Sequence, residues 1–142
     1  MSSAKKSSKR SELAYVRAAH RKLRASGIPT KWEAPLLGRS VDLIYYRDGE
    51  LHSIEFKLKD WRRAITQARD HQLGADFANI CLPEKTITQA MRDAAEAEGI
   101  GILELRESEP WPFSIVLHAR RSQDQWTVAR RNLIGLLTPS PL

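Results

Sequence analysis

The dipeptide Asp48-Gly49 constrains the fold of this chain more than any other feature, because it separates two short segments of alternating hydrophobic residues. Asp-Gly in this setting is the strongest short-range signal for a β-hairpin, since both residues tolerate the positive φ angles of a type I′ turn. The sequence therefore predicts two antiparallel strands over roughly 41–46 and 51–58. A two-residue turn also determines which residues of the two strands face each other.

That register places Asp42 directly opposite Glu55, with Lys57 two residues further on the same face. Like charges in directly opposed positions are unfavourable, so a compensating cation is expected at this point of the hairpin. Mg²⁺ is commonly held by one or two carboxylates together with water and phosphate oxygens. Lys57 could contact a phosphate, orient the attacking water or take part in proton transfer. The opposite face of the hairpin is expected in the core and contains Val41, Leu43, Tyr45, Ile54, Phe56 and Leu58.

Composition indicates one globular domain that works in a reducing, cytoplasmic setting. The 142 residues suit a single core, and the single cysteine, Cys81, excludes an internal disulfide and is expected to be a buried thiol. No apolar run is long enough for a membrane span. The formal net charge is +6, with basic residues crowded into the first 24 positions and again at Arg120, Arg121, Arg130 and Arg131. Such charge favours a nucleic-acid partner, but a solubilising surface has the same composition.

The remaining segments predict an α/β domain with a mixed central sheet flanked by helices. Residues 1–10 read as a disordered basic tail, 11–105 as the core and 106–142 as an extension of the same domain with a loose Pro-rich end. Helices are expected at 11–26, 61–73 and 86–98, and strands at 28–34, 77–82 and 100–105, with a loop over 35–38. In the extension, 114–118 predicts a strand and 126–137 a mixed strand-to-helix segment.

The acid pair, the lysine and the order α-β-β-β-α-β-α-β together resemble the PD-(D/E)XK nuclease superfamily, which shares the restriction-endonuclease-like fold. The resemblance covers residues 11–105. It implies that Asp42 and Glu55 bind Mg²⁺, with Mn²⁺ as a substitute, and that Lys57 is the catalytic amine. Val41 stands where many members have proline.

Further site residues are implied by the same resemblance. Many members add an acid from the first helix, here Glu12 as a metal ligand, and Glu33 competes with it as a catalytic acid near the 38–40 loop. Some members carry a helical glutamine followed four residues later by tyrosine. Gln67 fits the first position, while His71 stands at the second and reads, like His52, as a structural or surface group.

Basic residues close to the acid pair are candidates for phosphate contacts, with a solvated helix start as the alternative. They are Lys59, Arg62, Arg63 and Arg39. Trp32 and Trp61 flank the motif and could stack on unpaired bases, although core packing is the favoured interpretation.

The resulting hypothesis is a Mg²⁺-dependent endonuclease that hydrolyses DNA in repair, recombination or defence. Its layout resembles the small Holliday-junction-resolvase-like and repair-type members, and a homodimer is compatible with two-site cleavage. Two alternatives stay open from the sequence. One is a non-cleaving nucleic-acid-binding or adaptor module on the same fold, and the other is a metal-dependent RNase that uses the same residues.

Overall fold

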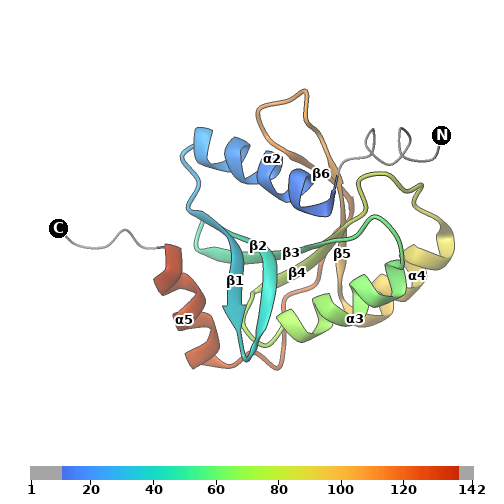
Figure 1. The fold of residues 1–142 in the computed structure, drawn as a ribbon. Helices are drawn as coiled ribbons and strands as arrows, with labels where there is room; N and C mark the ends of the chain where they lie inside the picture. Colours follow the sequence, from blue (N-terminus) through green and yellow to red (C-terminus); the bar gives the residue numbers. More distant parts are fainter. Residues whose placement is uncertain (1–10, 138–142) are drawn as a thin grey trace.

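The computed structural model describes residues 11–137, so the expected basic tail and the expected loose Pro-rich end lie outside the described residues. The helices are α2 (Glu12–Ala25), α3 (Trp61–His71), α4 (Gln89–Glu98) and α5 (Thr127–Leu137). The strands are β1 (Thr30–Leu36), β2 (Arg39–Arg47), β3 (Glu50–Phe56), β4 (Phe77–Cys81), β5 (Gly101–Leu105) and β6 (Phe113–Leu117). Figure 1 shows their arrangement, and the predicted order of elements is confirmed. Within 11–137, each helix is too short or too polar to cross a bilayer.

The six strands form one mixed sheet whose spatial order follows the chain from β1 to β6. The β3–β4 and β4–β5 pairs are parallel, because α3 and α4 carry the chain back between them, and the other neighbours are antiparallel. Asp48 and Gly49 have φ angles of 54° and 79°, as a type I′ turn requires. The hairpin pairs Tyr46 with Leu51, so the predicted register is confirmed.

A second hairpin corrects the expectation of a loop over residues 35–38. Pro35 pairs with Ser40 inside the β1–β2 ladder, and the turn consists of Leu37 and Gly38 alone, with φ angles of 51° and 79°. Pro35 is accommodated because β1 is the edge strand, where a missing N–H costs no ladder bond on the outer side. Leucine rarely adopts positive φ, so residue preferences could not reveal this turn.

Side-chain caps determine where the helices begin. Ser11 accepts a hydrogen bond at the start of α2 and Asp60 does so at the start of α3, both as expected. Thr88 caps α4, which therefore begins at Gln89 and not at the predicted residue 86. The segment over 126–137 was predicted to mix strand and helix; from Thr127 onward it is entirely helical.

Helices cover both faces of the sheet. Figure 1 shows α2 on one side and α3 and α5 on the other. A core cluster joins α2 to Leu43 and Ile54, a second joins α3 and α4 to β4 and β5, and a third joins α5 to Ile44. The expectation that these hairpin residues lie in the core is confirmed: Val41 packs in the third cluster with residues of α5, and the others pack in or against the first.

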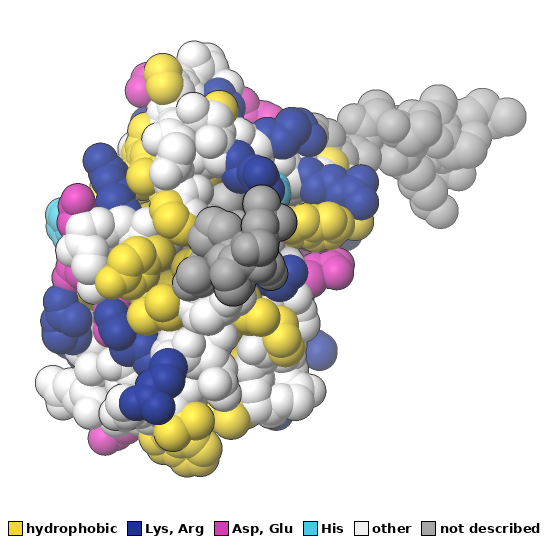
Figure 2. Space-filling view, turned by 90° about the vertical axis from the view of Figure 1, so that its left-hand side faces the viewer, with side chains coloured by type: hydrophobic (Ala, Val, Ile, Leu, Met, Phe, Trp, Pro, Cys, Tyr) yellow, Lys and Arg dark blue, Asp and Glu magenta, His cyan; other side chains and the backbone are white. Residues whose placement is uncertain are grey.

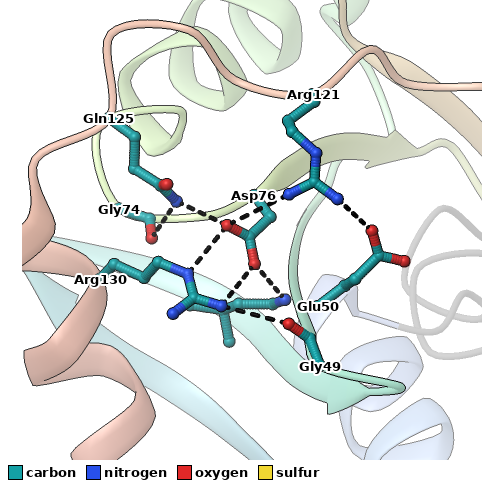
Figure 3. Close-up of polar contacts among 8 residues, drawn as sticks. Gly49, Glu50, Gly74, Asp76, Arg121, Gln125 and Arg130 are labelled. Atoms are coloured by element: carbon teal, nitrogen blue, oxygen red, sulfur yellow. Dashed lines mark hydrogen bonds and ion pairs between the residues drawn. The ribbon is translucent and has the colours of Figure 1, made fainter.

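Asp76, in the connection to β4, holds α5 and the hairpin together (Figure 3). Its side chain is 3% exposed and accepts hydrogen bonds from Leu51 N at 2.8 Å, from Gln125 Nε2 at 3.0 Å, and from Arg130 Nε and Nη2 at 2.9 and 3.0 Å. Arg130 also donates to the carbonyl of Gly49, in the turn itself. This cluster explains why α5 lies against the sheet, although its own sequence is a weak helix signal.

The second basic group expected near the end of the chain has structural partners. Arg130 and Arg121 lie against Asp76, Arg121 also pairs with Glu50, and Arg120 donates to the carbonyl of Glu96. On the face that carries α5, Figure 2 shows Lys and Arg in separate patches with hydrophobic side chains between them. Three of these four arginines thus contact acids or a carbonyl of the fold, and a role of the group in binding nucleic acid stays a prediction.

Candidate active site

Asp42 and Glu55 meet at the open end of the β2–β3 hairpin. The last backbone pair of the ladder joins Leu43 to Ile54, and beyond it the N–H of Phe56 donates to Asp42 Oδ2 at 2.8 Å. Glu55 is 4% exposed, and its Oε1 atom is buried without a hydrogen-bond partner. The side chain of Asp42 thus continues the hairpin where the backbone pairing stops, and this brings it to Glu55.

The pKa values of both carboxyl groups are raised above their ordinary values. Burial, followed by the negative charge of Asp42, raises the pKa of Glu55 to about 9. Burial also raises the pKa of Asp42, although hydrogen bonds from the Phe56 amide and from Glu55 oppose that shift. At neutral pH Glu55 is therefore protonated, because its carboxylate would be buried next to the charge of Asp42.

Lys57 and Glu12 border this pair on its solvent side. Lys57 Nζ lies 3.9 Å from Glu55 Oε2, and its side chain is 19% exposed. Glu12, at the start of α2, accepts a hydrogen bond from Leu58 N at 3.2 Å and contributes to the raised pKa values of Asp42 and Glu55. Both side chains line a shallow depression of about 400 Å³ together with Leu58, Lys59, Asp60 and Arg63.

His71 approaches the pair from α3, and Gln67 lies one helical turn before it on the same helix. His71 is 3% exposed, and its Nε2 atom lies 4.0 Å from Glu55 Oε1. Burial lowers the pKa of His71 to about 4, so the imidazole is neutral at pH 7. Gln67 Oε1 and His71 Nδ1 are both buried without a partner. The structural reading of His71 therefore overlooked its position beside Glu55, which the four-residue spacing from Gln67 could have indicated.

Three other candidates, Glu33, Arg39 and Lys59, are exposed. Glu33 is exposed on β1, opposite Asp42 by register, with a φ of 53°. Arg39 donates to Asp70 Oδ2 at 2.9 Å, whereas Lys59 is exposed beside the depression. The catalytic role of Glu33 and the phosphate-binding role of Arg39 and Lys59 stay predictions.

The tryptophans and the cysteine take structural positions. Trp32 and Trp61 each pack against a core cluster, as favoured, with Arg17 over the ring of Trp32 at 4.9 Å and Arg62 over that of Trp61 at 4.2 Å. Cys81 is fully buried, and burial raises the pKa of its thiol far above neutrality. This confirms the expectation of an unreactive buried thiol.

The donor set can be tested against the divalent cation that the resemblance implies. Among residues 11–137, no three His, Cys, Asp or Glu side chains are grouped so that they could hold a metal ion. Two adjacent carboxylates with an unpartnered buried oxygen match Mg²⁺, which usually takes one or two protein carboxylates and completes its shell with water and substrate oxygens. Asp42 and Glu55 thus fit such an ion, while Glu12 as a direct ligand stays a prediction.

Comparisons with known proteins find similarity in structure and none in sequence families. No protein-family model and no curated protein matches the sequence. Can2 from Sulfobacillus thermosulfidooxidans, solved with cyclic tetra-adenylate, superposes with a TM-score of 0.51 at 14% identity, over 89% of this chain and 35% of its own. A repair endonuclease from Pyrococcus abyssi superposes with a TM-score of 0.43 at 19% identity, over 72% of this chain and 48% of its own. SfsA from Pyrococcus furiosus, solved with Ca²⁺, superposes with a TM-score of 0.39 at 13% identity, over 75% of this chain and 62% of its own.

This chain spans between 35% and 62% of the length of those three proteins. The mixed six-stranded sheet in the order β1 to β6, with helices on both faces, and the superposition on Can2 define an α/β domain with the restriction-endonuclease-like fold. The predicted fold class is confirmed. At these identities the likeness concerns the fold, and the chemistry has to be argued from the residues.

Proposed function

We propose that this protein is a Mg²⁺-dependent endonuclease that hydrolyses phosphodiester bonds in DNA, in repair, recombination or defence. The observation that carries the proposal is the burial of Glu55 beside Asp42, with Lys57 Nζ 3.9 Å from Glu55 Oε2. A buried acid whose pKa is raised by a second carboxyl group is an unfavourable arrangement for a purely structural purpose. Perturbed acids at the edge of a depression are typical of catalytic sites.

Each residue of the proposed site has a distinct role. Asp42 and Glu55 would hold the cation, which when bound neutralises charge on the scissile phosphate and lowers the pKa of the attacking water. The ammonium group of Lys57 would donate to a phosphate oxygen or orient that water. Gln67, with its unpartnered buried oxygen, would accept a hydrogen bond from the water and fix its direction.

Phosphates on either side of the scissile bond would lie along the depression beside Lys57. Lys59 and Arg63 line it, and Arg62 is exposed next to them over the ring of Trp61. None of these three appears in an ion pair between described residues, so their charges are available to a polyanion. Such contacts position the backbone and carry no sequence information.

The direct test is incubation of the purified protein with supercoiled plasmid, a branched DNA junction and a matched RNA strand. We expect nicking of DNA with Mg²⁺ or Mn²⁺ that stops when a chelator is added. Binding of DNA without cleavage under any of these metals would support the adaptor alternative. Cleavage of RNA in preference to DNA would assign the same residues to an RNase.

Proton release gives a second test of the same site. Because Glu55 holds a proton with a pKa near 9, an ion that binds its carboxylate at neutral pH must displace that proton. Calorimetric titration with Mn²⁺ in buffers of different ionisation enthalpy is expected to report about one proton released per ion at pH 7, with tighter binding as the pH rises toward 9. A Glu55→Gln protein should release none, and Mn²⁺ affinity independent of pH would contradict this assignment.

A further inference from the structure

A second cavity, of about 320 Å³, lies on the other face of the sheet, away from the acid pair. Its walls come from β2 to β6 and from the loops beside them, and no residue of α2 lines it. Tyr45 in this cavity and Asp42 in the candidate active site stand three positions apart on β2, so their side chains point to opposite faces. The proposed nuclease chemistry leaves this cavity unused.

Three rings from adjacent strands form a row in the cavity. Tyr45 and His52 stack with centroids 4.6 Å apart and an angle of 4°, and Phe77 stacks on the other side of His52 at 5.3 Å and 21°. Trp111 stands edge-on to Tyr45 at 5.7 Å and 83°. Burial lowers the pKa of His52, so this row is uncharged at neutral pH. Phe113 also stacks on Tyr45, with centroids 6.2 Å apart, so the rings cover one another's faces and the row presents aromatic edges to the cavity.

Two guanidinium groups lie over aromatic rings of this cavity. Arg47 lies 4.2 Å from the ring centroid of Trp111, and Arg121 lies 4.9 Å from that of Phe77. Arg121 is held by Glu50, whereas Arg47 has only a 3.8 Å contact with Asp48, whose side chain is 87% exposed. Arg47 can therefore exchange that weak partner for a phosphate without leaving a buried charge unpaired.

We propose that this cavity binds an unpaired base of a single-stranded nucleic acid, with the base against Trp111 and the ring edges of His52 and Phe77, and its phosphate on Arg47. Aromatic rings and arginine planes are the surfaces on which proteins hold splayed-out bases. Asp48 and Glu50 line the cavity together with Arg47, and Arg121 lies over Phe77, so the local charge is balanced. It is the formal net charge of +6 of the whole chain that favours a polyanionic strand over a free mononucleotide. The cavity then serves as a second nucleic-acid contact, on the face of the sheet opposite the acid pair.

The test measures binding of a fluorescent single-stranded deoxyadenosine oligomer by anisotropy, in chelator, with the Asp42→Asn protein as background. Cleavage cannot interfere under these conditions, so this proposal can fail while the proposed function stands. We expect Arg47→Gln and Trp111→Leu each to weaken binding about tenfold. The matched controls Arg131→Gln and Trp126→Leu, which change exposed residues outside the cavity, should bind as the background protein does.

An abasic oligomer of the same length keeps the phosphates and lacks the bases. It therefore separates the contribution of base stacking to affinity from that of charge. It should bind the background protein about tenfold more weakly than the intact oligomer, and this difference should shrink in Trp111→Leu. Equal binding of both oligomers, or unchanged binding by Arg47→Gln, would overturn the proposal. Competition by adenosine monophosphate as effective as that of the oligomer would also overturn it, since a free nucleotide would then be the ligand. Arg47 is half exposed, so its substitution tests the site even if Trp111→Leu fails to fold.

Discussion

Replacement of Asp42 by asparagine is expected to abolish Mg²⁺-dependent cleavage of DNA, by about a thousandfold or more, while binding of DNA is kept. Loss of a metal ligand removes several kcal/mol of charge stabilisation in the transition state, and each ~1.4 kcal/mol corresponds to tenfold in rate. Asparagine preserves the acceptor that takes the N–H of Phe56, so the hairpin should stay intact. The measurements are plasmid nicking for cleavage and anisotropy with a duplex oligomer for binding.

The same substitution should raise the melting temperature in chelator. In the wild-type protein the pKa of Glu55 is raised to about 9, so the carboxyl pair destabilises the fold above the ordinary pKa of 4.5, increasingly up to pH 9. The Asp42→Asn change removes the negative charge beside Glu55, which is the second cause of the raised pKa after burial, and with it part of this destabilisation.

DNA cleavage and melting temperature of the Asp42→Asn protein together distinguish a functional site from a structural one. Full cleavage by Asp42→Asn would refute the proposed function, and a large fall in melting temperature would show a structural role instead. The matched control is a Lys59→Gln, Arg63→Gln protein, which changes charges beside the depression without touching the acid pair. We expect this variant to lose DNA affinity, most clearly at moderate salt, because it has fewer cations to release counterions from the backbone.

Asp76→Asn is expected to cost about 3 kcal/mol of the free energy of unfolding, the largest effect on stability that we anticipate for a single polar substitution. Removing one partner of a buried ion pair typically costs ~3–5 kcal/mol, and the partial exposure of Arg130 places this case at the lower end. Chemical denaturation followed by circular dichroism measures the change. Asp48→Asn is the control, because Asn-Gly suits the type I′ turn as well as Asp-Gly does.

The stability that Asp76 contributes should depend on pH in a defined direction. Burial would raise the pKa of Asp76, but hydrogen bonds from Arg130, Leu51 N and Gln125 outweigh it and hold the pKa below the ordinary 3.8. The contribution is therefore complete above pH 3.8 and is lost as the pH falls through the lower folded-state value. The gap between wild type and Asp76→Asn should narrow in acid, and a constant gap down to about pH 2 would contradict the network.

Local signals predicted those parts of the molecule that depend on a few neighbouring residues. Asp48-Gly49 determines a turn by backbone geometry, the turn determines the register, and the register brings Asp42 to Glu55. Ser11 and Asp60 mark helix starts because a cap bonds to an amide three residues away. In each case the interacting groups are close in sequence, so the pattern contains the whole interaction.

Interactions between distant segments could not be predicted in the same way. The turn at Leu37-Gly38 contradicts residue preferences and exists because the β1–β2 pairing around it is favourable. His71 reads as an ordinary helix residue until α3 packs its face against β3 and puts the imidazole beside Glu55. The arginines near the end of the chain read as a surface charge, yet two of them meet one carboxylate that lies some fifty residues away.

By itself, the sequence determined the hairpin, the order of elements and the pairing of two acids with a lysine, because these follow from backbone turn geometry and from strand alternation. Only the tertiary structure decided how buried Glu55 is, which groups of α3 reach it, and that Asp76 binds Arg130 to hold α5 in place. Burial is a property of packed layers, and it is burial that raises the pKa of Glu55. The chain encodes the acid pair locally, and the packing of the layers around it keeps Glu55 protonated at neutral pH.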